Sequence, residues 1–262
     1  MKRHVDEFGD RMKAYEQVET ARRADVHLPV YARIDGRGFS SFTRGMRRPF
    51  DPAMTDAMSE TTRHIVAETH ARIGYTQSDE ISLLWLAESE QSDIFFSGKL
   101  QKMVSVLASM AAAKFASVCP VGYEHKLPHF DARVFQLPDR DEGANALLWR
   151  AMDARKNAIS MVAQTHFSPR QLHGKGQADM LAMLDEIGVE FEALPVSFKR
   201  GSFFRRVNFE REMSPEEIEA IPDRHRPSGP FVRSEVRAID MPPFNKVTNR
   251  VAVVFDGEEP IA

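Results

Sequence analysis

A length of 262 residues with 42% hydrophobic and 28% charged side chains allows one large core, or one core with a smaller unit packed on it. The single cysteine, Cys119, excludes an intramolecular disulfide framework and a cysteine-based zinc site, and it fits a reducing compartment such as the cytoplasm. No stretch approaches the ~18 apolar residues of a membrane span. Because the net charge is −3, any nucleic-acid contact must come from local clusters of arginine and lysine.

The first expected elements are a strand and a helix joined by a polar loop. Val30–Ile34 alternates apolar and larger side chains, which predicts a strand that ends at Asp35-Gly36. After a loop over 37–50, Asp51-Pro52 predicts a helix start, because aspartate caps a helix and proline suits its first position. The helix should run to about Arg72, with one face formed by Met54, Met58, Thr62, Ile65 and Thr69.

A hairpin, a second helix and another strand should follow. The β-rich runs Ile73–Thr76 and Ile81–Leu86 flank the polar tetrapeptide Gln77–Glu80, which we interpret as the tip of a hairpin. Helical spacing of apolar residues predicts a helix over Lys99–Val118. The pattern of Phe130–Leu137 predicts a further strand.

The second half of the chain is mainly helical in its pattern. It contains a long helical segment, two shorter helices that begin at Ser168-Pro169 and at Gln177, and a basic run that we interpret as a hairpin. A capping box, a proline-rich loop and a last candidate strand complete it. In order, the segments are Asp139–Phe167, Ser168-Pro169, Gln177–Ile187, Val196–Phe209, Ser214–Glu217, Ile221–Pro230 and Arg250–Phe255.

This order of elements predicts an α+β fold. We expect an antiparallel sheet covered by helices, as in the palm of polymerases and nucleotidyl cyclases, with a smaller C-terminal extension of helices and a hairpin. The catalytic palm should comprise residues 1–138, and the helical and basic hairpin extension should comprise 139–262. We expect the extension to pack on the palm as one compact unit.

Two acidic positions carry the sharpest chemical signal. Asp35 should end a strand and Asp79 should lie at a hairpin tip, so two such elements side by side would bring both carboxylates to one shared ion. Mg²⁺ takes oxygen ligands and commonly uses one or two carboxylates together with substrate phosphates. Glycine at position 36 lets the backbone approach a metal or triphosphate, and its carbonyl is a further candidate ligand. The spacing also fits a simpler interpretation, in which both aspartates are ordinary polar turn residues.

Two segments resemble the signature segments of the tRNA-histidine guanylyltransferase family. They are Arg33-Ile34-Asp35-Gly36-Arg37-Gly38-Phe39 and Gly74-Tyr75-Thr76-Gln77-Ser78-Asp79-Glu80-Ile81-Ser82. Further resemblance lies in Arg48-Pro49-Phe50-Asp51, Lys99 and Lys102, Phe130-Asp131-Ala132-Arg133, and Lys199-Arg200-Gly201, so that roughly residues 5 to 205 are covered.

The resemblance implies an enzyme that adds nucleotides to the 5′ end of tRNA, in the direction opposite to ordinary polymerases. It implies two Mg²⁺ ions held by Asp35, Asp79 and the Gly36 carbonyl, with Glu80 in an auxiliary catalytic role. It also implies that ATP activates a 5′-monophosphate, or that a 5′-triphosphate is used directly, before the 3′-hydroxyl of an incoming nucleoside triphosphate such as GTP attacks. The implied partners are tRNA and nucleoside triphosphates, without a membrane, in a homotetramer built as a dimer of dimers.

The resemblance and the local charge together supply the remaining site residues. Candidates for nucleotide binding are Arg37, Gly38, Phe39, Arg48, Ser78, Lys99 and Lys102. Candidates for RNA or phosphate binding are Arg133, Arg155, Lys199 and Arg200. The basic run 199–206 is interleaved with phenylalanines, which suits phosphate contact with base stacking but equally suits the core of a strand. The charged loop over 37–48 and the exposed lysines also fit solvated surface.

One segment departs from the family pattern. Where eukaryotic members that add a single untemplated guanylate carry His-Ile-Asn-Asn-Leu-Tyr-Asn, this chain has Arg155-Lys156-Asn157-Ala158-Ile159-Ser160-Met161. The chain therefore resembles the bacterial and archaeal "like-protein" branch, which implies templated repair of truncated tRNA 5′ ends. Arg48 stands where relatives often have lysine, which keeps the charge and changes the geometry of a phosphate contact.

Two other function classes remain open at this point. A palm-type nucleotidyl cyclase or signalling-nucleotide synthase would place two aspartates in the same way, although the basic segments at 155–156 and 199–206 suit a long polyanion better than a free nucleotide. A non-catalytic RNA-binding module is the other class. Asp35, Asp79 and Glu80 speak against it, because negative charge repels phosphate.

Overall fold

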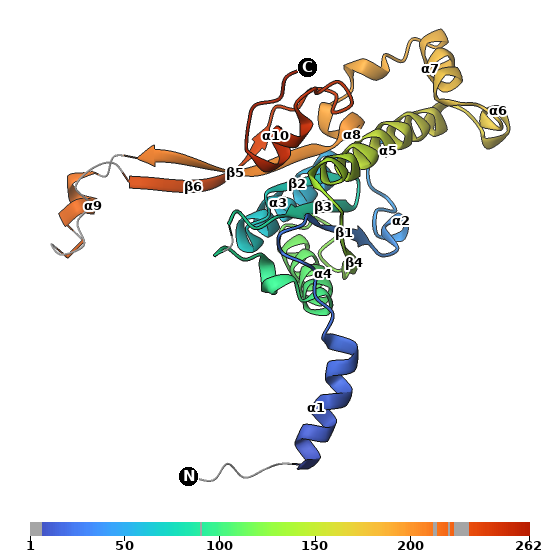
Figure 1. The fold of residues 1–262 in the computed structure, drawn as a ribbon. Coiled ribbons are helices and arrows are strands. Elements are labelled where there is room, and N and C mark those ends of the chain that lie inside the picture. Colours follow the sequence, from blue (N-terminus) through green and yellow to red (C-terminus); the bar gives the residue numbers. More distant parts are fainter. Residues whose placement is uncertain (1–6, 90, 212–213, 220, 223–230) are drawn as a thin grey trace, which may run out of the picture.

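The computed structural model describes residues 7–89, 91–211, 214–219, 221–222 and 231–262. In these ranges, the centre of the molecule is a six-stranded antiparallel sheet with the order β4-β1-β3-β2-β5-β6 (Figure 1). The strands are β1 Val30–Gly36, β2 Ile73–Gln77, β3 Glu80–Trp85, β4 Phe130–Gln136, β5 Ser202–Arg211 and β6 Phe231–Ile239. The α+β class and the antiparallel sheet are thereby confirmed.

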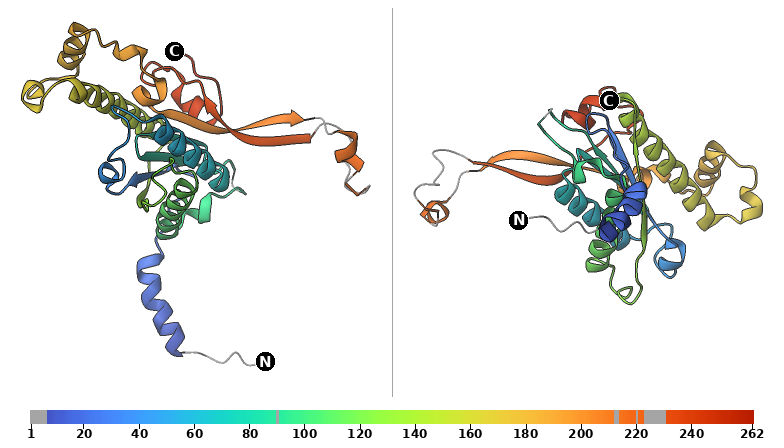
Figure 2. Two further views of the ribbon diagram at one scale, coloured as in Figure 1. Left: turned by 180° about the vertical axis from the view of Figure 1, so that it is seen from behind. Right: turned by 60° about the horizontal axis from the view of Figure 1, so that its bottom comes forward.

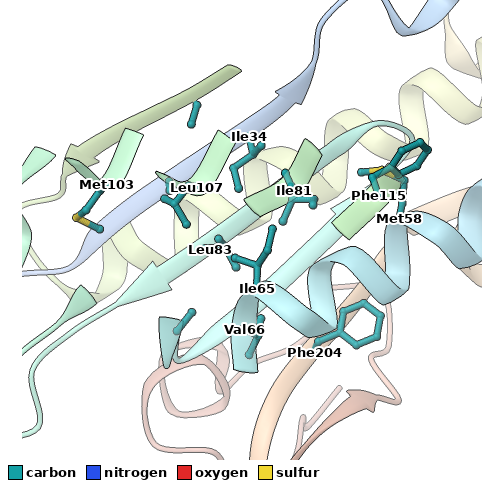
Figure 3. Packing of buried hydrophobic residues seen from close by; sticks show 14 of the residues in the cluster. Ile34, Met58, Ile65, Val66, Ile81, Leu83, Met103, Leu107, Phe115 and Phe204 are labelled. Carbon is teal, nitrogen blue, oxygen red and sulfur yellow. The ribbon is translucent and has the colours of Figure 1, made fainter. Parts of the chain in front are cut away.

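Helices α3 (Pro52–Thr69) and α4 (Leu100–Ser117) cover one face of the sheet. The predicted cap of α3 is present, because the Asp51 carboxylate accepts hydrogen bonds from the backbone of Ala53 and Met54 at 3.0 and 3.4 Å. The helix lies close to β2, where a Cβ on Gly74 would stand 2.4 Å from Val66. Figure 3 shows the resulting core, in which side chains from both helices meet those of β1, β3 and β5.

The opposite face of the sheet is covered by α5 (Arg140–His166) and α10 (Arg250–Phe255). Side chains alternate between faces along a strand. On β1, for example, Ile34 therefore belongs to the core under α3 and α4, while Tyr31 belongs to the core under α5. The last half of α5 extends beyond the sheet and packs against α7 (Gln177–Glu186) around Ile159 and Leu184.

Short elements connect these layers. The small helices are α2 Phe39–Phe42, α6 Pro169–Leu172, α8 Val196–Arg200 and α9 Pro215–Glu219, with 3₁₀ turns at η1 Phe95–Gly98 and η2 Phe191–Ala193. The predicted capping box before α9 is present, since the backbone of Ser214 donates to Glu217 and the backbone of Glu217 donates back to the Ser214 hydroxyl.

Two parts project from the body of the molecule. Helix α1 (Glu7–Thr20) extends away beside the start of α4, and the β5–β6 ribbon extends to the side and carries α9 near its end (Figures 1 and 2). No residue of α1 is buried. None of the helices in the described ranges has the length and apolar character that a bilayer crossing requires.

Two predicted strand segments are wrong, and the expected loop over 37–50 contains the short helix α2. Val196–Phe209 was expected to form a hairpin, but Val196–Arg200 is a single helical turn that ends at Gly201, where φ is +74°, and only then does β5 begin. Arg250–Phe255, expected as a strand, is helix α10, because its apolar residues Val253, Val254 and Phe255 are all buried against α5. The expected loop Ile221–Pro230 lies outside the described residues except for its first two positions.

Candidate active site

The ends of two neighbouring strands bring Asp35 and Asp79 together. In the β1–β3 register, Asp35 lies opposite Glu80, the residue after Asp79. The Gly36 amide donates a hydrogen bond to the Asp79 carbonyl at 3.1 Å, which ties the end of β1 to the hairpin tip. Ser78 takes a left-handed conformation at this tip, with φ +51°, and its hydroxyl donates to the Asp79 carboxylate at 3.1 Å. The predicted hairpin with its acidic tip is confirmed.

The electrostatics of this corner favour a cation. Burial, and next the nearby charge of Asp35, raise the pKa of Asp79 from 3.8 to about 6. Two carboxylates that repel each other in a partly buried site are stabilised when a divalent ion lies between them.

The donor set fits Mg²⁺. In the described part of the chain, no three His, Cys, Asp or Glu side chains are grouped so that they could hold a metal by themselves. Mg²⁺ does not need such a cage, because it keeps several waters and binds through one or two carboxylates plus substrate phosphates. Asp35, Asp79 and the Gly36 carbonyl are oxygen donors of this kind.

Gly36 and Phe39 have a packing role beside this corner. A Cβ at position 36 would lie 2.3 Å from the Phe39 ring, so only glycine lets that ring reach its place. Phe39 is buried and contacts the rings of Phe42, Phe115 and Phe130 at centroid distances of 4.9, 5.5 and 5.0 Å. Its ring is therefore part of the core.

A shallow cavity of about 260 Å³ adjoins the loop after β1. It is lined by Arg37, Gly38 and Phe39 on one side and by Lys126 and His129 on the other. The Arg37 amide donates to the His129 carbonyl at 2.8 Å, which joins the two sides. Three of the residues expected to bind a nucleotide thus lie together.

Glu80 is held by an arginine from α5. The Arg150 guanidinium donates to both carboxylate oxygens of Glu80, at 2.6 and 2.8 Å, and the Arg33 Nε lies 3.9 Å from the same carboxylate. Burial raises the pKa of Glu80, while Arg150 opposes this shift by hydrogen bonding and by its charge. Because both oxygens are engaged, Glu80 connects the hairpin to α5 and is not free to hold a metal in this arrangement.

Sequence reasoning did not single out Arg150. Its side chain is buried, and it also donates to Asp153 at 3.1 Å. One signal in the sequence could have identified it. Arg150 lies between Leu147 and Ala154 at the helical spacing of the side chains of α5 that are buried. A charged residue on such a stripe needs an ionic partner from another element.

Two candidate lysines lie away from the aspartates. Lys99 and Lys102 are exposed at the beginning of α4. The backbone of Lys99 forms an isolated antiparallel β-bridge with the backbone of Arg23, ahead of β1. The other end of this 18-residue helix, about 27 Å away, places Phe115 against Phe39 near the site. Within one chain, the structure therefore places these lysines at the end of α4 that is remote from Phe39.

The basic run 199–206 is largely committed to internal contacts. Lys199 is buried, and its ammonium donates to the carbonyl and carboxylate of Glu192. Arg205 is bound by the C-terminal segment at Glu258 and Glu259, and Arg206 donates to the Ala67 carbonyl at 2.6 Å. Phe203 and Phe204 are buried on opposite faces of the sheet, which confirms the strand-core interpretation.

The remaining candidates are more accessible. Arg155 pairs with Glu192 at 2.6 Å, and Arg133 lies 3.6 Å from Asp131 with a side chain that is 56% exposed. Arg48 is exposed in the loop before α3. No hydrogen bond or ion pair engages the Arg200 guanidinium among the described residues, and Arg200 lines a second cavity.

Comparisons with known proteins agree with this arrangement. The family model described as tRNAHis guanylyltransferase matches residues 9–138. A bacterial tRNA(His) guanylyltransferase (Thg1)-like protein in complex with ATP is 40% identical, with a TM-score of 0.72 over 76% of this chain and 88% of its own. A bacterial Thg1-like protein in complex with GTP is 33% identical, with a TM-score of 0.74 over 92% of this chain and 95% of its own. The tRNA(His) guanylyltransferase of Schizosaccharomyces pombe is 26% identical over 218 residues, covering 76% of this chain and 82% of its own length.

The fold and these relatives define the chain as a nucleotidyltransferase. Its identity to the ATP-bound bacterial protein, over most of that protein's length, is well beyond what a shared fold alone requires. The chain belongs to the tRNAHis guanylyltransferase (Thg1) family.

Proposed function

We propose that this protein adds nucleotides to the 5′ end of a tRNA or tRNA-like RNA in the 3′-to-5′ direction, with templated repair of truncated ends as its role. The observation that carries the proposal is the position of Asp35 at the end of β1, opposite Glu80 and beside Asp79 of the β2–β3 turn, with the Gly36 amide hydrogen-bonded to the Asp79 carbonyl. The bacterial relatives bound to ATP and to GTP support nucleoside triphosphates as substrates.

In the proposed reaction, Asp35, Asp79 and the Gly36 carbonyl would hold two Mg²⁺ ions. These ions would supply charge neutralisation at the triphosphate and a lower pKa for the attacking 3′-hydroxyl. ATP adenylylates a 5′-monophosphate end with release of pyrophosphate, and the 3′-hydroxyl of the incoming nucleotide then displaces AMP. When the end is a 5′-triphosphate, the same hydroxyl displaces pyrophosphate directly. Arg37 and Gly38 follow Gly36 in the chain and Ser78 precedes Asp79, and these residues would orient the nucleotide. Arg48 would reach its phosphates as a charge-assisted donor.

The assembly belongs to the same proposal. The catalytic part is residues 1–138, and 139–262 forms the extension packed on it. We propose that the protein is a homotetramer that acts in the cytoplasm. Sedimentation of the purified protein will test the oligomeric state. In such an assembly, Lys99 and Lys102 could act at a site of a neighbouring copy, since they are exposed and lie away from Asp79 of their own chain.

The first experiment is an extension assay. Purified protein is incubated with Mg²⁺, ATP, labelled nucleoside triphosphates and a tRNA that lacks its first 5′ nucleotide, and the products are resolved on a sequencing gel. We expect addition of the nucleotide complementary to the opposing base of the acceptor stem. A cyclic or linear nucleotide product formed without RNA, in place of extension, would instead identify a nucleotide cyclase or synthase.

The metal assignment has its own test. Asp35→Ala and Asp79→Ala should each reduce extension by at least about a thousandfold, because each removes a ligand from the catalytic ions. Circular dichroism should remain that of the wild type, since both changes relieve carboxylate repulsion at a partly exposed corner. Retained extension in either variant would refute the assignment.

A further inference from the structure

A second cavity, of about 440 Å³, lies between α5, α8 and the C-terminal segment. Its volume falls in the range of small-ligand sites. The apolar lining includes Met152, Phe203, Met241 and Phe244, and Pro242 and Pro243 continue it toward the surface. Phe203 and Phe244 are buried and pack together at 5.0 Å, so they form a rigid floor.

Met152 is, with Val196 of α8, one of the exposed apolar side chains that line this cavity. It projects from α5 and is 59% exposed. A thioether makes favourable contacts with aromatic rings and adapts to their shape. Met152 with the two prolines therefore offers a surface for a planar ring.

The charge of the cavity favours an anion. Its lining holds three cationic side chains, Arg155, Arg200 and Lys246, and one acidic side chain, Glu192. Glu192 is already bound by Arg155 and by the buried Lys199. Within the described residues, no hydrogen bond or ion pair engages the Arg200 or Lys246 side chain, so two positive charges remain for a ligand.

The cavity adjoins the strand that leads to Asp79. The Tyr75 hydroxyl donates to the Arg200 carbonyl at 2.9 Å, and a Cβ on Gly201 would lie 2.5 Å from the Thr76 carbonyl. Thr76 precedes Asp79 by three residues, which corresponds to roughly 10 Å along an extended chain. A polymer whose end reacts at Asp79 would therefore place a neighbouring unit in this cavity.

We propose that this cavity binds one nucleotide of the RNA substrate next to the reacting end, with the base on Met152 and the prolines and the phosphodiesters at Arg200 and Lys246. This inference rests on the proposed function. A free nucleoside triphosphate fits less well, because the only carboxylate in the lining is neutralised and cannot hold the metal that accompanies a triphosphate. Two uncommitted cations match the single charges of successive phosphodiesters.

The test compares binding of RNA with binding of ATP. Anisotropy of a labelled, 5′-truncated tRNA is measured for Met152→Glu and Lys246→Glu, and calorimetry measures Mg-ATP binding to the same proteins. The matched controls are Met161→Glu, an exposed methionine on α5 outside the cavity, and Lys175→Glu, an exposed lysine before α7. We expect the cavity variants to raise the Kd for RNA at least about tenfold, while the controls change it less than about twofold and all bind Mg-ATP as the wild type does.

The outcomes separate this inference from the proposed function. If the cavity variants bind RNA as tightly as the controls do, the cavity inference is overturned. If they bind Mg-ATP more weakly and RNA unchanged, the cavity is instead a site for a free nucleotide. A wild-type protein that binds the RNA without extending it would refute the proposed function and leave the cavity assignment standing.

A second measurement does not depend on affinity. A benzophenone amino acid in place of Met152 should crosslink to the RNA at one or two nucleotides near its 5′ end or the opposing strand, whereas the same group in place of Met161 should not. Crosslinking that is absent at 152, or spread evenly over the RNA, contradicts a built nucleotide site.

Discussion

At the scale of single residues, Asp79 couples the chemistry of the site to stability. Its pKa is raised from 3.8 to about 6 by burial and by Asp35. Because the folded value lies above the unfolded value, the ionised carboxylate destabilises the metal-free fold above about pH 6, and this penalty is absent below about pH 4. We expect Asp79→Asn to increase the free energy of unfolding at pH 7, in a chelating buffer, by up to roughly 3 kcal/mol.

Urea unfolding between pH 4 and pH 8 measures this effect. The advantage of Asp79→Asn should shrink as the pH falls from about 6 to about 4, because the wild-type carboxyl then becomes neutral. Asp56→Asn, on the exposed side of α3, is the control for a general effect of removing one negative charge. An advantage that is constant over the whole range would show that charge at position 79 is not its source.

At the scale of elements, the ion pair of Arg150 with Glu80 connects α5 to the β2–β3 hairpin. The pair is buried and doubly hydrogen bonded. We expect Arg150→Met to lower the free energy of unfolding by about 3–5 kcal/mol, because it leaves an uncompensated carboxylate in the core. Chemical denaturation of the metal-free protein measures the loss.

A double-mutant cycle identifies the partner. Arg150→Met combined with Glu80→Gln should lose less stability than the sum of the two single changes, since the buried charge is then removed. Additive losses would mean that Arg150 stabilises α5 through contacts other than Glu80. Arg140→Met, at an exposed ion pair with Asp256 at the start of α5, should cost less than about 1 kcal/mol and serves as the control.

At the scale of the whole molecule, the proposed RNA substrate would have to be bound by a few cations on a protein of net charge −3. Arg200 and Lys199 are adjacent in sequence, yet Lys199 is buried against Glu192 while Arg200 lines the cavity. Each phosphate contact adds about 0.7–0.9 to the dependence of log K on log salt. We therefore expect Arg200→Met to reduce this slope by about one and Lys199→Met to leave it unchanged, as measured by RNA anisotropy over a salt series. Equal slopes for the two variants would remove Arg200 from the phosphate contacts.

The sequence by itself determined the local parts of this protein. The Asp51 cap, the hairpin tip at Ser78-Asp79 and the strand before Gly36 depend on neighbours within a few residues, and those predictions are confirmed. The sequence also predicted that Asp35 and Asp79 would meet if their elements lay side by side, and the pairing of β1 with β3 fulfils that condition.

Only the tertiary structure decided which charged side chains are available. Lys199 and Arg200 are adjacent in α8 and have the same local pattern. Their roles differ because the Lys199 side chain is buried and bonded to Glu192 of η2. The fate of Glu80 depends on Arg150, which lies 70 residues away in the chain, and the six apolar-rich residues of α10 became a helix because α5 offers them a surface. The physical reason is that burial and ion pairing arise between distant segments, whereas propensity and capping act only along the chain.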